Sequence, residues 1–319
     1  MKIDPALIER AAAILRNGGL VAFPTETVYG LGANALDEKA VRRIYEVKGR
    51  PRTSPLILHV CSLAMAKELT SEWPVKAETL ARRYWPGPLT LVLPKSQIVS
   101  DRLTAGLDTV GIRMPDHPVA LAMIKAAGVP VAAPSANLFT ALSPTTAAHV
   151  VESLGDRVDL ILDGGPTKVG IESTVLGLAH DLALLLRPGM LTRAELEESI
   201  GPINVLQASL ESGAGAQPSP GMHARHYSPL TPMYLIEKES DWPGRGHGVY
   251  FSLGGYQELA GLAGKVVMMP QSAKAYAAAL YEQLHEQDRG QWDWIGVELP
   301  VGGEEWDGVL DRLKRAAKH

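Results

Sequence analysis

The sequence predicts an α/β protein, with a twisted mixed sheet covered by helices and a small α/β domain joined to it by a linker. Short apolar runs typical of buried strands alternate with stretches of helical periodicity. Some of these runs follow one another with no helix between them, which favours a mixed sheet over a purely parallel one. A stretch rich in Ser, Gly, Ala and Pro then divides the chain into a large and a small part.

The first part begins with a helix at Asp4-Pro5, because Asp caps a helix and Pro suits its first turn. Residues 18–19, both Gly, end that helix, and residues 20–23 form a short buried strand. A polar loop, residues 24–30, leads to a second helix at residues 37–47. Further strands are expected at residues 56–60, 89–93, 110–113, 129–133, 160–162, 173–178 and 182–187, with helices near residues 80, 122 and 150.

The second part follows the linker-like composition of residues 208–221. Its expected strands are residues 233–236, 248–252, 266–269 and 295–299, and its expected helices are residues 273–287 and 308–317. The predicted organisation is therefore a domain at residues 1–202, a linker and lid at 203–229, and a small domain at 230–319, a size consistent with independent folding.

Charge and cysteine content exclude several classes of protein. The 319 residues carry 31 Lys and Arg against 35 Asp and Glu, a net charge of −4. This balance argues against extensive electrostatic binding of nucleic acid or an anionic membrane. The single cysteine, Cys61, allows no disulfide within the chain and indicates a reducing compartment. With no signal peptide and no apolar run long enough to span a bilayer, we expect a cytoplasmic protein.

Two short patterns resemble those of dinucleotide and metal sites, but their surroundings in the sequence do not fit such sites. Residues 30–35 match the glycine pattern of dinucleotide sites, but a loop separates them from the strand and no acidic residue follows at the required distance. The pair His223 and His226 has the spacing of metal ligands but lacks further ligands nearby. We therefore expect no metal held by the protein itself, and any nucleotide site must be of another design.

Cations follow several predicted strands and helices. Lys48, Arg50 and Arg52 surround a turn in which Gly49 ends a helix and Pro51 prevents its continuation. Arg113 and Arg187 each stand at the end of a predicted strand. A basic turn alone is more often simply solvated. The shared placement at strand ends, however, predicts that these cations converge on one anionic ligand, since guanidinium groups fork onto phosphate and carboxylate oxygens.

Hydroxyl and amide side chains cluster at the same kind of position. They occur in the loop of residues 24–30, in residues 134–137 after a strand, and in residues 143–145 at a helix start. In open α/β sheets, ligands bind at this edge. The polar, aromatic-bearing residues 219–227 at the end of the linker are interpreted as a lid over that ligand.

Nine segments in order resemble the threonylcarbamoyl-AMP synthases, the YrdC/Sua family in its long form with an additional C-terminal domain. They are PTETVYGLG, KGRPRTSPLILH, PGPLT, RMPDHP, PSAN followed by SPTTAAHV, DGG, GIEST, LLRPG and SPGMHARHYSP. The resemblance is dense over residues 20–189, sharp at 219–229 and weak beyond. It implies a YrdC-like sheet with a deep, positively charged cavity, a mobile linker and a small Rossmann-like module.

The activity implied is the formation of threonylcarbamoyl-AMP and pyrophosphate from L-threonine, bicarbonate or CO₂, and ATP that carries Mg²⁺. The family passes this product to a tRNA threonylcarbamoyl transferase complex, so direct tRNA binding is expected to be weak or absent. Such chemistry needs cations around the phosphates and a positioned carbamate. It needs no covalent protein nucleophile.

The resemblance also implies roles at matching positions. The threonine positions are Thr27, His59, Arg113, Ser135 and Ser173, and the ATP positions are Lys48, Arg50, Ser54, Thr109, Asn137, Thr145, Arg187, His226 and Tyr227. Lys48 and Arg50 are the expected catalytic cations, whereas Arg52 is expected on the surface. Glu26 and Tyr29 are expected in the cavity wall.

One segment departs from the family pattern. After PSAN the family continues with a residue and then Ser-Gly, whereas this chain has residues 138–141, Leu-Phe-Thr-Ala, which puts the path of that loop in doubt. Two alternatives remain: an RNA-binding translation or ribosome-assembly factor that uses the same basic cavity, and a related carbamoyl-transfer enzyme that makes a different adenylate.

Overall fold

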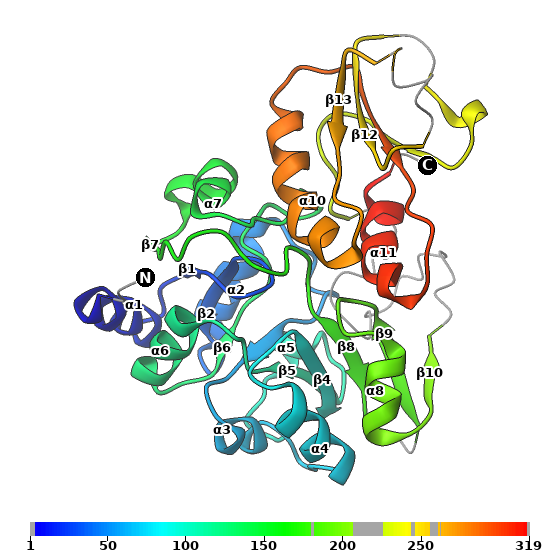
Figure 1. Cartoon of the computed structure of the whole chain (residues 1–319). Coiled ribbons are helices and arrows are strands. Elements are labelled where there is room, and N and C mark those ends of the chain that lie inside the picture. Colours follow the sequence, from blue (N-terminus) through cyan, green and yellow to red (C-terminus); the bar gives the residue numbers. More distant parts are fainter. Residues whose placement is uncertain are drawn as a thin grey trace.

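The computed structural model describes residues 4–179, 182–206, 226–243, 246–255, 261 and 263–317. Within these residues the chain forms two units, each built on its own sheet (Figure 1). Most of the expected linker, residues 207–225, and with it His223, lies outside the described residues. The predicted α/β class is confirmed.

The larger sheet contains ten strands within the described residues. In spatial order they are β10 (Ile203–Val205), β9 (Ala183–Arg187), β8 (Thr174–Gly177), β4 (Leu89–Pro94), β5 (Thr109–Arg113), β3 (Ile57–His59), β6 (Val131–Ala132), β2 (Gly30–Asn34), β1 (Val21–Phe23) and β7 (Leu160–Ile161). Parallel pairs such as β3 with β5 adjoin antiparallel pairs such as β4 with β5, so the sheet is mixed as predicted.

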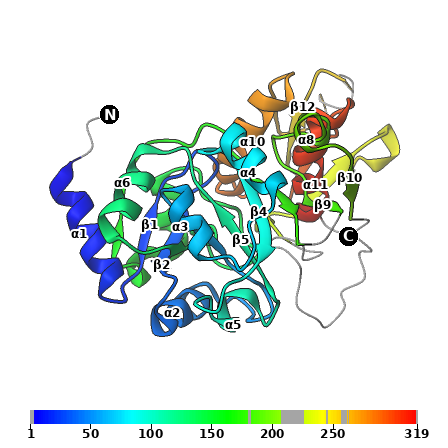
Figure 2. The same ribbon diagram turned by 90° about the horizontal axis from the view of Figure 1, so that it is seen from below.

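Helices cover this sheet on both faces. They are α1 (Pro5–Arg16), α2 (Glu38–Lys48), α3 (Leu63–Glu68), α4 (Val75–Tyr84), α5 (Asp101–Thr104), α6 (Pro118–Ala127), α7 (Ala147–Leu154) and α8 (Arg193–Ile200), with a 3-10 turn η1 (Gly155–Arg157). α1 and α6 lie together at one end of the molecule and bury Leu15 and Met123 in a shared apolar cluster (Figure 2). Helix α1 begins as predicted, with the Asp4 side chain accepting a hydrogen bond from the Ala6 N–H.

The smaller unit is a four-stranded sheet in which every described pair is parallel, as a Rossmann-like module requires. Its elements are β11 (Met233–Ile236), η2 (Glu239–Asp241), β12 (Gly248–Ser252), β13 (Lys265–Met268), α10 (Ala273–Asp288), β14 (Trp294–Glu298), η3 (Glu304–Trp306) and α11 (Asp307–Ala316). Figure 1 shows α10 and α11 facing the larger unit. The apolar cluster beneath these helices also includes Val28, Leu142 and Ile171 of the larger unit. The two units therefore share buried apolar contacts.

Two details differ from the expectation. Strand β10 pairs with β9 and extends the larger sheet to Val205, past residue 202 where we expected the linker to begin. Residues 30–34 form strand β2, antiparallel to β1, where no strand was expected; as the sequence context indicated, they are not the turn of a dinucleotide site. A Cβ atom on Gly32 would lie 2.8 Å from side-chain atoms of Phe23 and Val131, so this glycine permits close packing.

Candidate functional site

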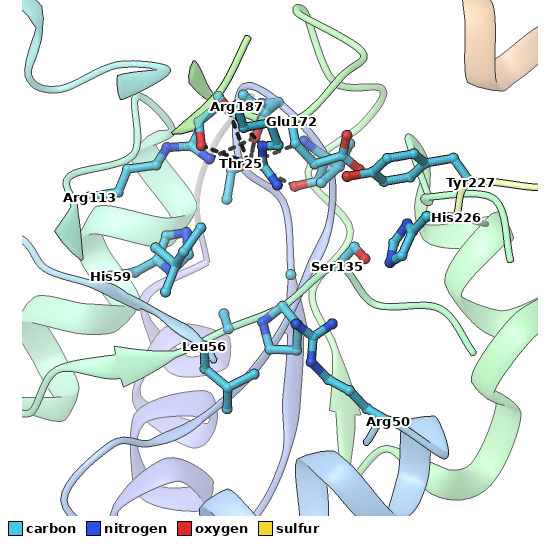
Figure 3. Close-up of a pocket in the computed structure, with 17 residues that line it drawn as sticks. Thr25, Arg50, Leu56, His59, Arg113, Ser135, Glu172, Arg187, His226 and Tyr227 are labelled. Atoms are coloured by element: carbon cyan, nitrogen blue, oxygen red, sulfur yellow. Dashed lines mark hydrogen bonds between the residues drawn. The ribbon is translucent and has the colours of Figure 1, made fainter. Parts of the chain in front are cut away.

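One cavity brings the strand-end residues together (Figure 3). It lies where loops after β1, α2 and β6 meet the ends of β3, β5 and β9, and it encloses about 50 Å³. Its lining is Thr25, Thr27, Val28, Gly30, Arg50, Leu56, Ile57, His59, Arg113, Ala133, Pro134, Ser135, Glu172, Ser173, Arg187, His226 and Tyr227. Figure 3 shows His226 and Tyr227 entering from the side opposite His59 and Arg113.

Nine of the residues expected to bind substrate line this cavity. They are Thr27, Arg50, His59, Arg113, Ser135, Ser173, Arg187, His226 and Tyr227. The other five, Lys48, Ser54, Thr109, Asn137 and Thr145, are not among the lining residues. The cavity thus contains every residue expected to bind threonine and four of those expected to bind ATP.

The Arg113 side chain is held at one corner of the cavity by three groups. Its guanidinium forms an ion pair with Glu26 at 2.7 Å, donates to Thr27 Oγ1 at 2.9 Å and donates to the Gly87 carbonyl at 3.2 Å. Each terminal nitrogen carries a second N–H, so the group can still receive a carboxylate. Glu26 supports this corner from behind, since its other oxygen accepts the Asp116 N–H and it does not line the cavity.

His59 is buried beside this corner as a neutral imidazole. Burial, reinforced by the charge of Arg113, lowers the pKa of His59 from 6.5 to about 3. Within the described residues its Nδ1 atom has no hydrogen-bond partner. The ring packs edge-on against Phe23, with centroids 6.0 Å apart. A neutral nitrogen with an unused hydrogen bond suits contact with a polar substrate group.

Ser173 and Arg187 form a second corner. The Arg187 guanidinium donates to the Ser173 carbonyl at 3.0 Å and to its Oγ at 3.2 Å, and Thr90 Oγ1 lies 2.8 Å from the same Oγ. Burial lowers the pKa of Arg187 below its usual range, but a guanidinium stays protonated in proteins. This corner therefore presents a rigid cation.

Arg50 supplies the third cation. It is 7 % exposed, and Nη2 donates to the Pro55 carbonyl at 3.1 Å. Burial lowers the pKa of Arg50 to about 10, which leaves it charged at neutral pH. Its guanidinium carbon stands 5.8 Å from the ring centre of Phe139, the residue that departs from the family pattern, and that ring also meets His226 edge-on. Phe139 is thus a support for Arg50 and His226.

Lys48 lies beneath the PSAN loop and outside the cavity. Its ammonium donates to the Ser135 carbonyl at 2.6 Å and also to the Asn137 carbonyl. Burial and the neighbouring Arg50 lower the pKa of Lys48 well below its usual value, while these carbonyl acceptors favour the charged form. In this structure Lys48 fixes the loop that carries Ser135.

The remaining predicted residues surround the cavity at a distance. Asn137 donates to the carbonyls of Leu138 and Ala141 and so shapes the departing loop. The Thr145 hydroxyl lies 3.3 Å from His149 Nδ1. Ser54 is buried next to the Arg50 turn, and Thr109 lies at the start of β5 in a separate small cavity. Their proposed contacts with ATP stay predictions.

Tyr29 and Arg52 both lie outside the cavity lining. The Tyr29 hydroxyl donates to the Gly165 carbonyl at 2.8 Å and lies outside the cavity lining, so it holds the Asp-Gly-Gly turn. The expectation that Glu26 and Tyr29 line the cavity wall was wrong, because Glu26 lies behind Arg113 and the Tyr29 hydroxyl is bonded to this turn. Arg52 is exposed, as predicted.

Glu172 is the acidic residue of the lining, and sequence reasoning assigned it no role. Burial would raise the pKa of Glu172, but the charges of Arg312 and Arg187 lower it below its usual range. Its oxygens accept hydrogen bonds from Ser143 Oγ at 2.5 Å and from Tyr281 at 3.2 Å. In the sequence, Glu172 stands next to Ser173, which was expected to bind substrate, and this position could have marked Glu172 as a site residue.

The cavity is therefore cationic, buried and suited to an anion. Arg50, Arg113 and Arg187 face one lining carboxylate, that of Glu172, and all four residues are buried. Fixed cations in a poorly solvated site stabilise developing negative charge without reorganisation. Among the described residues, no group of three or more His, Cys, Asp or Glu is placed to hold a metal ion. Nor is any described helix long and apolar enough to cross a membrane.

Family models match both parts of the chain. A model described as "Telomere recombination" matches residues 13–189, and one described as "Threonylcarbamoyl-AMP synthase, C-terminal domain" matches residues 191–318.

Curated relatives match nearly the whole chain. The threonylcarbamoyl-AMP synthase of Bacillus subtilis is 45 % identical over 98 % of this chain and 93 % of the relative. The threonylcarbamoyl-AMP synthase of Pyrococcus abyssi is 42 % identical over 99 % of this chain and 95 % of the relative.

Among solved structures, the crystal structure of P. abyssi Sua5 complexed with L-threonine matches with a TM-score of 0.92. It shares 42 % sequence identity over 99 % of this chain and 96 % of that one.

Proposed function

The chain belongs to the threonylcarbamoyl-AMP synthase family, and we propose that its cationic cavity binds L-threonine and ATP and makes threonylcarbamoyl-AMP. The observation that carries this proposal is the convergence of Arg50, from the end of helix α2, and of Arg113 and Arg187, from two separate strand ends, on one buried cavity. A relative of the same architecture, P. abyssi Sua5, has been crystallised with L-threonine.

The two corners of the cavity suit the two substrates. Arg113 offers N–H groups to the carboxylate of threonine, with Thr27 and the neutral His59 beside it. Arg50 and Arg187 stand toward the side of His226 and Tyr227 and offer positive charge to phosphates (Figure 3). In this arrangement the amine of threonine points between the two corners, where the new bond forms.

The reaction we propose needs positioning and charge stabilisation. The amine of threonine combines with bicarbonate, with loss of water, or with CO₂, with loss of a proton, to give a carbamate. A carbamate oxygen then attacks the α-phosphorus of ATP. The bond from that phosphorus to the bridging oxygen breaks, and pyrophosphate leaves with its electron pair. Arg50 and Arg187 stabilise the charge that develops on the phosphate oxygens. Burial protects the carbamate from water.

We propose that Mg²⁺ arrives bound to ATP, that bicarbonate or CO₂ supplies the carbamate carbon, and that a separate tRNA threonylcarbamoyl transferase complex takes the product in the cytoplasm. A mixed anhydride between a carbamate and a phosphate hydrolyses easily, so its consumer must act quickly. Direct tRNA binding should be weak, because the three arginines are less than a tenth exposed and cannot reach an RNA backbone. This burial also disfavours the RNA-binding alternative.

The size of the cavity supports a lid role for His226 and Tyr227. Pockets for small ligands commonly measure about 300–1,000 Å³, and this one encloses about 50 Å³. We propose that the His226-Tyr227 segment withdraws to admit ATP and then returns over it. If so, Tyr227→Ala should raise the association and dissociation rates of ATP together in stopped-flow binding. Unchanged rates would contradict the lid.

The experiment that tests the function is a pyrophosphate assay with the purified chain, ATP, Mg²⁺ and bicarbonate. Pyrophosphate should form only when L-threonine is added. Release without threonine would contradict the proposal, and carbamoyl phosphate in place of threonine and bicarbonate would reveal the related carbamoyl-transfer reaction.

A further inference from the structure

A buried arginine of the C-terminal unit reaches into the wall of the cavity. Arg312, on α11, is fully buried. Its Nε donates to Glu172 Oε2 at 2.8 Å, and its two terminal nitrogens donate to the Glu172 carbonyl at 3.0 Å and the Pro188 carbonyl at 2.8 Å. Its guanidinium carbon also stands 5.4 Å from the ring centre of Tyr227. The Arg312 side chain thus contacts Glu172, which precedes Ser173, and Pro188, which follows Arg187. It also contacts Tyr227 at the end of the linker.

Close backbone contacts fix α11 and α10 in this position. A Cβ atom on Gly308 would lie 2.7 Å from the Gly189 carbonyl oxygen, and one on Gly170 would lie 2.2 Å from the Ala277 carbonyl oxygen. The backbones of the two units therefore approach closely at Gly170 and at Gly189, which precede and follow Glu172 in the chain. The Arg315 carbonyl accepts the His226 N–H at 3.1 Å, which ties the linker end to the same helix.

The Glu172 carboxylate belongs both to the cavity lining and to the contact with the C-terminal unit. Its carboxylate lines the cavity together with Arg187, yet its ion pair is with Arg312. Ser143 and Tyr281 donate hydrogen bonds to the same carboxylate. Without Arg312, a buried carboxylate would need another cation, and Arg187, whose charge already acts on Glu172, lies in the same lining. Pairing there would neutralise the corner expected to receive phosphate.

We propose that Arg312 is a positioning residue for adenylation: it holds the Glu172 carboxylate on the side of the C-terminal unit, away from Arg187, and so makes docking of that unit a condition for ATP binding. This inference rests on the proposed function of the cavity. It assigns the C-terminal unit a part in the active site, although α11 contributes no lining residue.

The test compares full-length Arg312→Met with two control variants. Arg193→Met and Arg289→Met each remove an exposed ion pair between the same two units, with Glu304 and Glu152 respectively. ATP binding is measured by calorimetry without threonine, and steady-state kinetics are measured with it. We expect Arg312→Met to weaken ATP binding about tenfold or more, with little change in the KM for threonine, while the controls bind ATP like the wild type.

A second substitution separates positioning from a loss of fold. Adding Glu172→Gln to Arg312→Met removes the carboxylate that would neutralise Arg187, so ATP binding should recover in part. Arg312→Lys should fall between wild type and Arg312→Met, because an ammonium lacks the planar fork. Equal ATP affinity in Arg312→Met and the controls, or no recovery in the double variant, would overturn the proposal.

The two proposals fail in different ways. If the wild type releases no threonine-dependent pyrophosphate, the proposed function is wrong, while the ATP-binding comparison still decides the role of Arg312. If the wild type is active and Arg312→Met matches the controls, only the positioning role is wrong.

Discussion

Replacing Arg113 by Met removes one half of a buried ion pair. Arg113 Nη2 and Glu26 Oε1 are 2.7 Å apart, and both side chains are 5 % exposed. The substitution leaves the Glu26 carboxylate buried, with the Asp116 N–H as its other contact. Removing one partner of a buried pair costs about 3–5 kcal/mol, because the remaining charge is uncompensated.

The assay is thermal unfolding of the purified variant. The quantity compared is the melting midpoint and not a free energy of unfolding, because the two units need not unfold in one step. In a domain of this size, each kcal/mol of lost unfolding free energy lowers the melting midpoint by about 2–4 °C, so the midpoint of Arg113→Met should fall by about 10 °C. Arg193→Met is the matched control. Its pair with Glu304 is 2.8 Å long but 40 % and 36 % exposed, and such pairs contribute about 1 kcal/mol or less.

The double variant Arg113→Met with Glu26→Gln should melt above the single variant, because a buried amide carries no charge. An Arg113→Met midpoint within about 2 °C of the wild type would refute the reasoning. So would a double variant no more stable than the single one.

Four further predictions concern the cavity, the sheet, the interface between the units and the metal. Arg113→Lys should raise the KM for threonine far more than the KM for ATP, because an ammonium cannot fork onto a carboxylate; the opposite pattern in steady-state kinetics would place this residue with ATP. Gly32→Ala should lower stability by about 1–3 kcal/mol through overpacking, whereas Gly111→Ala, whose nearest contact would be 3.4 Å away, should change the melting midpoint less. Burial lowers the pKa of both His149 and His285, stacked 3.8 Å apart across the two units, from 6.5 to about 4. The unfolded chain therefore takes up protons first, so the melting midpoint should fall as the pH drops from 6.5 toward about 4, and replacing both by Gln should flatten that fall. EDTA should stop pyrophosphate release without moving the melting midpoint of the free protein, and a midpoint shift would indicate a metal held by the chain.

Local patterns predicted the fold class and the convergence of the strand-end cations, whereas the roles of the other lining residues were implied by the family resemblance. Apolar runs locate strands, and a polar residue just after a strand lies at the edge of the sheet, so the sequence alone was enough to place Arg113 and Arg187 together. The strand at Gly30–Asn34 was not predicted, because its glycines lack the side chains that mark a strand. The absence of a side chain at Gly32 allows Phe23 and Val131 to pack closely.

Contacts distant in sequence could not be predicted in the same way. Lys48 stands beside Arg50 in the chain, yet the fold directs its ammonium to the carbonyls of Ser135 and Asn137. Arg312 lies at a buried position of α11 between Val309 and Leu313, and a cation in an apolar stripe is a signal of a buried partner. Only docking of the two units identifies that partner as Glu172.

The most direct test of the central claim is mass spectrometry of the product formed with ¹³C-labelled bicarbonate. Purified full-length chain, ATP, Mg²⁺ and L-threonine should yield an adenylate that contains threonine and one labelled carbon, together with pyrophosphate. An adenylate of threonine without the label, or AMP formed without threonine, would contradict the account.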